Sequence, residues 1–172
     1  FRQVNNIKKT LFLLPLFLAF FFCTSCGALN KPVKPKSVEV DFSKERAVRC
    51  VYNGHITSFN ICEKDGGFSF LVTDREPSVL SGTEILFLND NCTVTSQALS
   101  FSRAISEYSD SFLPKILYIF IKETDFSQTA PKYDKKSGDF TYSAVAAGKF
   151  VQLVIEKNAA DGEEYLYTFK VV

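Results

Sequence analysis

Among the side chains that could do chemistry in this chain are five cysteines and a single histidine, His55. A cysteine thiolate is a nucleophile or a metal ligand, and histidine is a common general base. Cys23 and Cys26 follow an apolar run at residues 11–22. Ser25 precedes Cys26 and Gly27 follows it, so small residues surround this thiol. Three cysteines and one histidine remain in the rest of the chain.

The segment at residues 1–26 resembles a bacterial lipoprotein signal peptide. It has a positively charged start, and its apolar run at residues 11–22 is shorter than the roughly 20 residues that span a bilayer. In that family the final cysteine is diacylated and becomes the mature N-terminus. The resemblance therefore implies Cys26 as the lipidation site, with Ser25 directly before it. The segment departs from the family pattern at Cys23, where leucine is usual.

Two other interpretations of this segment remain open, namely a secretory signal cut near Ser25 or Ala28, and an uncleaved anchor. All three place the following domain outside the cytoplasm. Residues 27–37 contain two prolines and three lysines and predict an extended tether. We therefore expect one domain at residues 38–172, held at a membrane of the cell envelope by an N-terminal lipid. The chain begins with Phe1, so we expect that its start is truncated or misread.

The charge balance gives no sign of a nucleic-acid partner. Three of the 20 basic residues precede Cys26, which leaves 17 basic against 19 acidic residues and a net charge of −2. No basic stripe stands out along the chain, so nucleic-acid binding is not expected.

Catalytic motifs are missing from the sequence. His55 follows an Asn-Gly turn, where a histidine is usually solvated. There is no Gly-x-Ser-x-Gly elbow and no glycine-rich phosphate loop. Since a catalytic site needs polar groups that converge, we expect no enzyme activity, no catalytic residues and no cofactor.

The three remaining cysteines, Cys50, Cys62 and Cys92, match no zinc-binding spacing, so we expect no metal site. A tight hairpin at the Asn-Gly turn would place Cys50 opposite Thr57, which disfavours a bond from Cys50 to Cys62. One disulfide with a free thiol, or three reduced and buried cysteines, both remain open.

Alternating apolar and polar residues separated by turn residues predict antiparallel strands. The expected fold is mainly β (α+β), an antiparallel meander sheet of about nine strands with one apolar helix. A loop is expected at residues 126–137. The strands are expected at residues 37–42, 46–52, 55–63, 67–73, 83–88, 92–96, 138–147, 149–157 and 163–172, with a short further segment at 99–102.

A helix is expected near residues 112–124, with Asp110 or Ser111 as its cap and Pro114 in its first turn. A buried strand is the alternative for this segment. The helical interpretation depends on a broad apolar stripe at helical spacing, formed by Phe112, Leu113, Ile116, Leu117, Phe120 and Ile121.

Short motifs make the domain similar to the outer-membrane lipoprotein carrier (LolA/LolB-like) fold. Residues 78–82 followed by 85–87 look like the Leu-x-Gly turn after the fourth strand of that fold. Residues 93–95 and 99–101 look like the strand pair that precedes its helical segment, although Ala98 stands where glycine is expected. In that family a strongly curved sheet wraps a helix, and the apolar face between them accepts acyl chains or another hydrophobic ligand. The resemblance therefore implies a strongly curved antiparallel meander sheet that wraps the one apolar helix. The resemblance implies that the ligand-facing residues are Phe112, Ile116, Leu117 and Phe120.

Two functions therefore remain open. The first is a non-enzymatic, membrane-anchored extracytoplasmic lipoprotein that binds a lipid or other hydrophobic ligand between sheet and helix. The alternative is a surface structural or protein-interaction lipoprotein with a fully packed core and no ligand. A sheet must bury one face in either case, so the same apolar residues serve both functions. The oligomeric state does not follow from the sequence.

Overall fold

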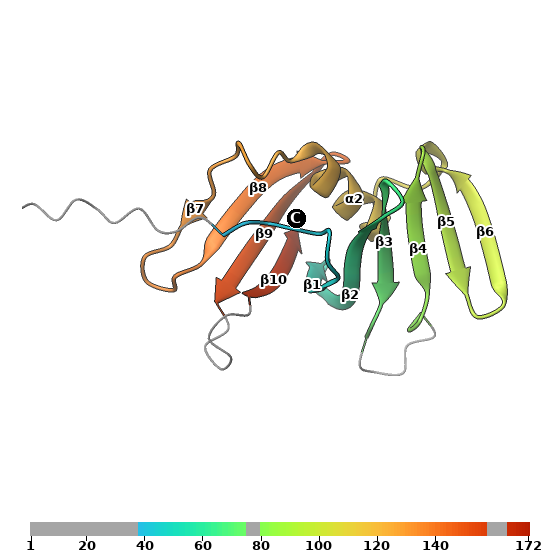
Figure 1. Ribbon diagram of the computed structural model, residues 1–172, viewed down its shortest axis with the longest axis horizontal. Coiled ribbons are helices and arrows are strands. Elements are labelled where there is room, and N and C mark those ends of the chain that lie inside the picture. Colours follow the sequence, from blue (N-terminus) through green and yellow to red (C-terminus); the bar gives the residue numbers. More distant parts are fainter. Residues whose placement is uncertain (1–37, 75–79, 158–164) are drawn as a thin grey trace, which may run out of the picture. The chain divides into compact units, whose positions relative to one another are not determined.

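The computed structural model describes residues 38–74, 80–157 and 165–172. The predicted signal peptide with Cys26 and the predicted tether lie outside these residues. In the described part, ten strands form one open sheet and a single α-helix packs against it (Figure 1). The elements are β1 (Arg46–Tyr52), β2 (His55–Lys64), β3 (Gly67–Val72), β4 (Glu84–Leu88), β5 (Asn91–Ser96), β6 (Leu99–Ala104), the 3-10 turn η2 (Ile105–Glu107), α2 (Leu113–Glu123), β7 (Lys132–Tyr133), β8 (Phe140–Ala146), β9 (Lys149–Lys157) and β10 (Tyr165–Val171).

The sheet consists of two antiparallel meanders that meet at its centre. Its strand order is β6-β5-β4-β3-β2-β1-β10-β9-β8-β7. Strands that are adjacent in the sheet are therefore consecutive in the chain, except for β1 and β10. That pair is parallel, with Arg49 beside Thr168 in the register. The expectation of a mainly β fold with one helix is confirmed. The sheet is antiparallel, as expected, except at this junction, where the first and last strands run in the same direction.

Two further differences concern which segments form strands. The two-residue strand β7, which pairs with β8, falls inside the segment expected to be a loop, and it is one of the ten strands of the sheet. The expected strand at 37–42 is absent from its described part, residues 38–42. Both sides of β1 are already taken by β2 and β10, so this segment covers the apolar face of the sheet instead. Phe42 is buried there against the rings of Phe126 and Tyr167.

Helix α2 confirms the helical interpretation of residues 112–124, but its predicted cap was wrong. Phe112 occupies the N-cap position and makes no side-chain capping bond. Asp110 instead accepts a hydrogen bond from Lys115 Nζ at 2.8 Å, and the same amino group donates to the carbonyl of Tyr108 at 2.7 Å. Lys115 is buried, so these two acceptors offset the cost of removing its charge from water.

Helix α2 packs across both meanders. Tyr118 stacks on Phe87 of β4, with ring centroids 4.5 Å apart. Two residues further on, Phe120 meets Phe169 of β10 edge to face at 5.6 Å. Each fully buried aromatic side chain stabilises the folded state by about 1.5–3 kcal/mol relative to exposure. The sheet, α2 and the core cluster all lie within residues 38–172, so this part of the chain has a hydrophobic core of its own.

Tight turns explain why the strands pair locally. The predicted hairpin at Asn53 and Gly54 is confirmed, with positive φ values of 50° and 78°. Gly67 has a different role, because a Cβ at this position would overlap the backbone carbonyl of Phe87 on β4. The start of β3 can therefore approach β4 only because residue 67 has no side chain.

We predict that Gly67→Ala destabilises the domain by about 1–3 kcal/mol, because the added methyl must displace the backbone of β4. Urea unfolding followed by circular dichroism measures this change. Gly54→Asn is the matched control, since asparagine accepts positive φ and should cost much less. Equal stability of Gly67→Ala and the parent would contradict the close approach of β3 and β4.

Candidate functional site

The structure places three of the four predicted ligand-facing residues on the buried face of α2. Ile116 and Leu117 are fully buried and Phe120 is 1% exposed. The fourth, Phe112, is half-buried at the start of the helix, where its ring stacks on Tyr108 at 5.0 Å. Phe120 is in ring contact with both Phe169 and Phe126. These side chains therefore have protein partners, as residues of a packed core do.

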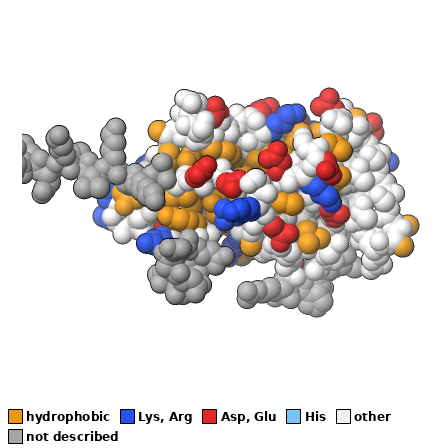
Figure 2. Space-filling model, viewed as in Figure 1, with side chains coloured by type: hydrophobic (Ala, Val, Ile, Leu, Met, Phe, Trp, Pro, Cys, Tyr) orange, Lys and Arg blue, Asp and Glu red, His pale blue; other side chains and the backbone are white. Residues whose placement is uncertain are grey.

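Apolar surface is not confined to the interior. Figure 2 shows hydrophobic side chains gathered around α2 and strands β8–β10, with far fewer over β4 and β5. Large exposed apolar residues occur at both ends of the sheet, among them Val145 and Phe150 on one side and Leu99 and Phe101 on the other. Single exposed apolar residues are ordinary, so only groups of them are informative.

The residues that sequence analysis tested for catalysis are not brought together. His55 is exposed at the tip of the β1–β2 hairpin, where it pairs with Tyr52. Among the described residues, no group of three or more His, Cys, Asp and Glu side chains is placed to hold a metal ion.

All three described cysteines are free thiols. Cys50 lies opposite Thr57, as the hairpin geometry predicted. Burial raises the pKa of the Cys50 thiol far above its ordinary value, and burial also raises the pKa of Cys92. Because only the thiolate is nucleophilic, Cys50 and Cys92 act as small apolar core residues.

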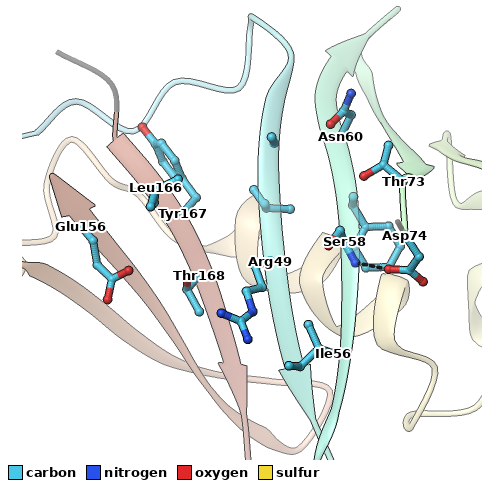
Figure 3. Close-up of a pocket in the computed structure, with 13 residues that line it drawn as sticks. Arg49, Ile56, Ser58, Asn60, Thr73, Asp74, Glu156, Leu166, Tyr167 and Thr168 are labelled. Carbon is cyan, nitrogen blue, oxygen red and sulfur yellow. Dashed lines mark hydrogen bonds between the residues drawn. The ribbon is translucent and has the colours of Figure 1, made fainter. Parts of the chain in front are cut away.

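A broad pocket of about 1070 Å³ lies over strands β1, β2, β9 and β10 and the end of β3. The residues that point into it alternate with core residues along each strand, so it is on the outer face of the sheet, opposite α2 (Figure 3). Its polar lining residues are Arg49, Ser58, Asn60, Thr73, Asp74, Glu156 and Thr168. We call this the outer-face pocket.

Arg49 lies near the middle of the outer-face pocket (Figure 3). In the register it is flanked by Ser58 on β2 and by Thr168 on β10. Its side chain is exposed and has no hydrogen-bond or ion-pair partner within the described residues. An unpaired guanidinium beside two hydroxyl groups offers a fork of donors to an incoming acceptor.

Two carboxylates stand on opposite sides of Arg49. Asp74, after the end of β3, accepts a hydrogen bond from the Ser58 backbone N–H at 2.7 Å (Figure 3). On the other side, Glu156 lies on β9, which is two strands from β1 in the sheet order. Both carboxylates line the same pocket as the guanidinium.

Sequence reasoning did not identify this pocket. The alternation of β1 does place Arg49 on the face opposite Val48 and Cys50, and that signal was readable. The sequence carries no signal for the parallel pairing of β1 with β10. This pairing brings Thr168 and Glu156 close to residues that lie over 100 positions earlier in the chain.

Comparisons with known proteins found no matching family model, no matching curated protein and no matching solved structure. The resemblances to a lipoprotein signal and to the carrier fold therefore stay predictions from sequence motifs. Within the described residues, no helix has both the length and the apolar character needed to cross a membrane.

Proposed function

We propose that this protein is a membrane-anchored, extracytoplasmic lipoprotein that catalyses no reaction and binds a partner molecule through the outer-face pocket. The proposed anchor is a lipid on Cys26, as the N-terminal segment implies. The observation that carries the binding function is that Arg49, which has no ionic or hydrogen-bonding partner in the described part of the chain, lies in the middle of a pocket on the polar face of the sheet.

The proposed site is on the outer face because the helix side of the sheet is occupied by side chains. Ile116, Leu117 and Phe120 contact the sheet and have little or no exposed surface. A ligand between α2 and the sheet would have to replace these contacts, and packed cores tolerate inserted volume poorly. The outer-face pocket requires no such rearrangement.

The chemistry of the pocket favours a ligand with one carboxylate or similar oxyanion. A guanidinium binds a carboxylate through two parallel hydrogen bonds, and these charge-assisted bonds are roughly twice as strong as neutral ones. The hydroxyl groups of Ser58 and Thr168 can donate to the same oxygens. Asp74 and Glu156 disfavour additional negative charge, so a monoanion should bind better than a dianion.

Binding of a hydrophobic ligand between sheet and helix is the second candidate. The observation that favours it is that α2 lies across one face of the sheet, as the carrier resemblance implies. Organic extraction of purified protein separates the two functions. The outer-face proposal expects no stoichiometric lipid in the extract, whereas a tightly held lipid lost in Leu117→Asp would support the carrier function.

The anchoring half of the proposal is tested by metabolic labelling with palmitate in a bacterial host. We expect label in the parent chain and none in Cys26→Ala, because in lipoproteins that cysteine carries the acyl groups. Cys23→Ala is the matched control and should retain the label. Equal labelling of the parent and Cys26→Ala would contradict lipid attachment at this residue.

The binding half is tested by two-dimensional NMR on residues 27–172, titrated separately with acetate and with inorganic phosphate at low salt. We expect saturable shifts at the amides of Arg49, Ser58 and Thr168, with acetate binding more tightly than phosphate. Arg49→Gln should weaken acetate binding by about 10-fold or more, since a charge-assisted hydrogen bond contributes roughly 1.5–3 kcal/mol.

Lys170→Gln is the control for the binding experiment. Lys170 is exposed on the same outer face, two residues along β10 from Thr168, and its removal changes the net charge equally. It should leave acetate binding unchanged. Equal loss in both variants would indicate diffuse charge attraction, and shifts spread evenly over the surface would also count against the pocket.

A further inference from the structure

The two edges of the sheet differ in how well they are protected. An exposed edge strand presents unpaired N–H and C=O groups, and proteins usually blunt such edges with short strands, proline or lysine. The edge β7 has all three features, because it has two residues, follows Pro131 and includes Lys132. The edge β6 has six residues, no proline and one charged residue, Arg103. Only the β7 edge is therefore guarded.

The backbone groups of β6 that face away from the sheet can be identified. A two-residue turn joins β5 to β6, with Ser96 paired to Leu99, and such a turn is closed by a hydrogen-bonded pair. The same alternation continues to Ile105, whose N–H donates to the carbonyl of Asp90 at 2.9 Å. The N–H and C=O groups of Ser100 and Ser102 therefore point outward from the edge.

The side chains of β6 also remain uncovered. Leu99 is 78% exposed and Phe101 is 53% exposed. Both lie on the α2 face of the sheet, because Phe101 pairs with Val94 and Val94 pairs with Ile85 of the core. On the opposite face, Ser100 Oγ and Thr95 Oγ1 share a hydrogen bond at 3.0 Å.

We propose that β6 is a docking edge for a second copy of this chain, which adds its own β6 as an antiparallel strand. In this arrangement Ser100 lies opposite Ser100 of the partner subunit, and the outward N–H and C=O groups of the two residues bond to each other. Leu99 then lies opposite Phe101 of the partner subunit, and the reverse contact forms by symmetry. These are the closely spaced, non-hydrogen-bonded positions, where side chains interact best.

The pattern of β6 is what selects a second copy as the occupant. The strand has one apolar residue on each side of Ser100, so it is complementary to itself when it runs in the opposite direction. Its single charge does not oppose the pairing, because the two Arg103 side chains are six residues from each other's register position. That spacing is about 20 Å in an antiparallel strand, beyond the screening length at physiological salt.

The pairing goes beyond the proposed ligand binding and does not depend on it. The outer-face pocket is centred on β1, five strands from β6 in the sheet order, so each subunit keeps an open pocket. A contact between two short strands buries less area than a standard interface, and the expected dimer is therefore weak and concentration-dependent.

Sedimentation equilibrium on residues 27–172, from about 1 to 300 μM, tests the pairing in the concentration range expected for a small interface. We expect a monomer–dimer equilibrium in the parent. Ser100→Pro removes an outward N–H without removing a bond within the subunit, so it should weaken dimerisation at least 10-fold. Ser100→Ala is its control and should dimerise like the parent, because only the hydroxyl is lost.

A second pair of variants covers the case in which proline disturbs the subunit. Phe101→Lys should abolish the dimer by placing a charge among the apolar contacts, whereas Val145→Lys, at a 67% exposed residue of β8, should not. Hydrogen exchange should protect the Ser100 amide only at high concentration. A monomer at every concentration, or a dimer that survives Phe101→Lys, would overturn the proposal.

Discussion

The contact on which this structure depends is the packing of α2 across the junction of two meanders. Tyr118 stacks on a ring of β4, and Phe120 meets a ring of β10 on the other side of the parallel β1–β10 pair. A single short helix thus buries apolar side chains from both halves of the sheet at once. Without it, each half would expose one apolar face to water, at a cost of about 25 cal/mol for every Å² of apolar surface.

The same contact leaves other surfaces free. Ten strands spaced about 4.8 Å apart make a sheet over 40 Å wide, whereas eleven helical residues extend about 16 Å. The chain before β1 and the segment after α2 extend the cover through Phe42 and Phe126. The β6 edge stays open because the cover ends before it reaches that strand, and the outer face stays open because α2 packs on the opposite face of the sheet.

Local patterns were sufficient to predict most elements of this fold. Alternation and turn residues predicted β1, β2, β3 and the last strands, since one buried face imposes a period of two. The helix was predicted from its apolar stripe, although Lys115 rather than the backbone became the partner of Asp110. The parallel pairing of β1 with β10 could not be predicted, because no local sequence signal indicates which strands pair when about 100 residues separate them. The pocket around Arg49 depends on that pairing and was missed with it.

The most direct test of the role of α2 is native-state hydrogen exchange of residues 27–172 at increasing denaturant. If the helix joins both meanders into one core, amides in β3 and β4 should open with the same free energy as amides in β9 and β10. Truncation of the shared contact in Phe120→Ala should lower both values together, by about 3–5 kcal/mol. Separate opening of the two meanders, with only one affected by Phe120→Ala, would contradict the account.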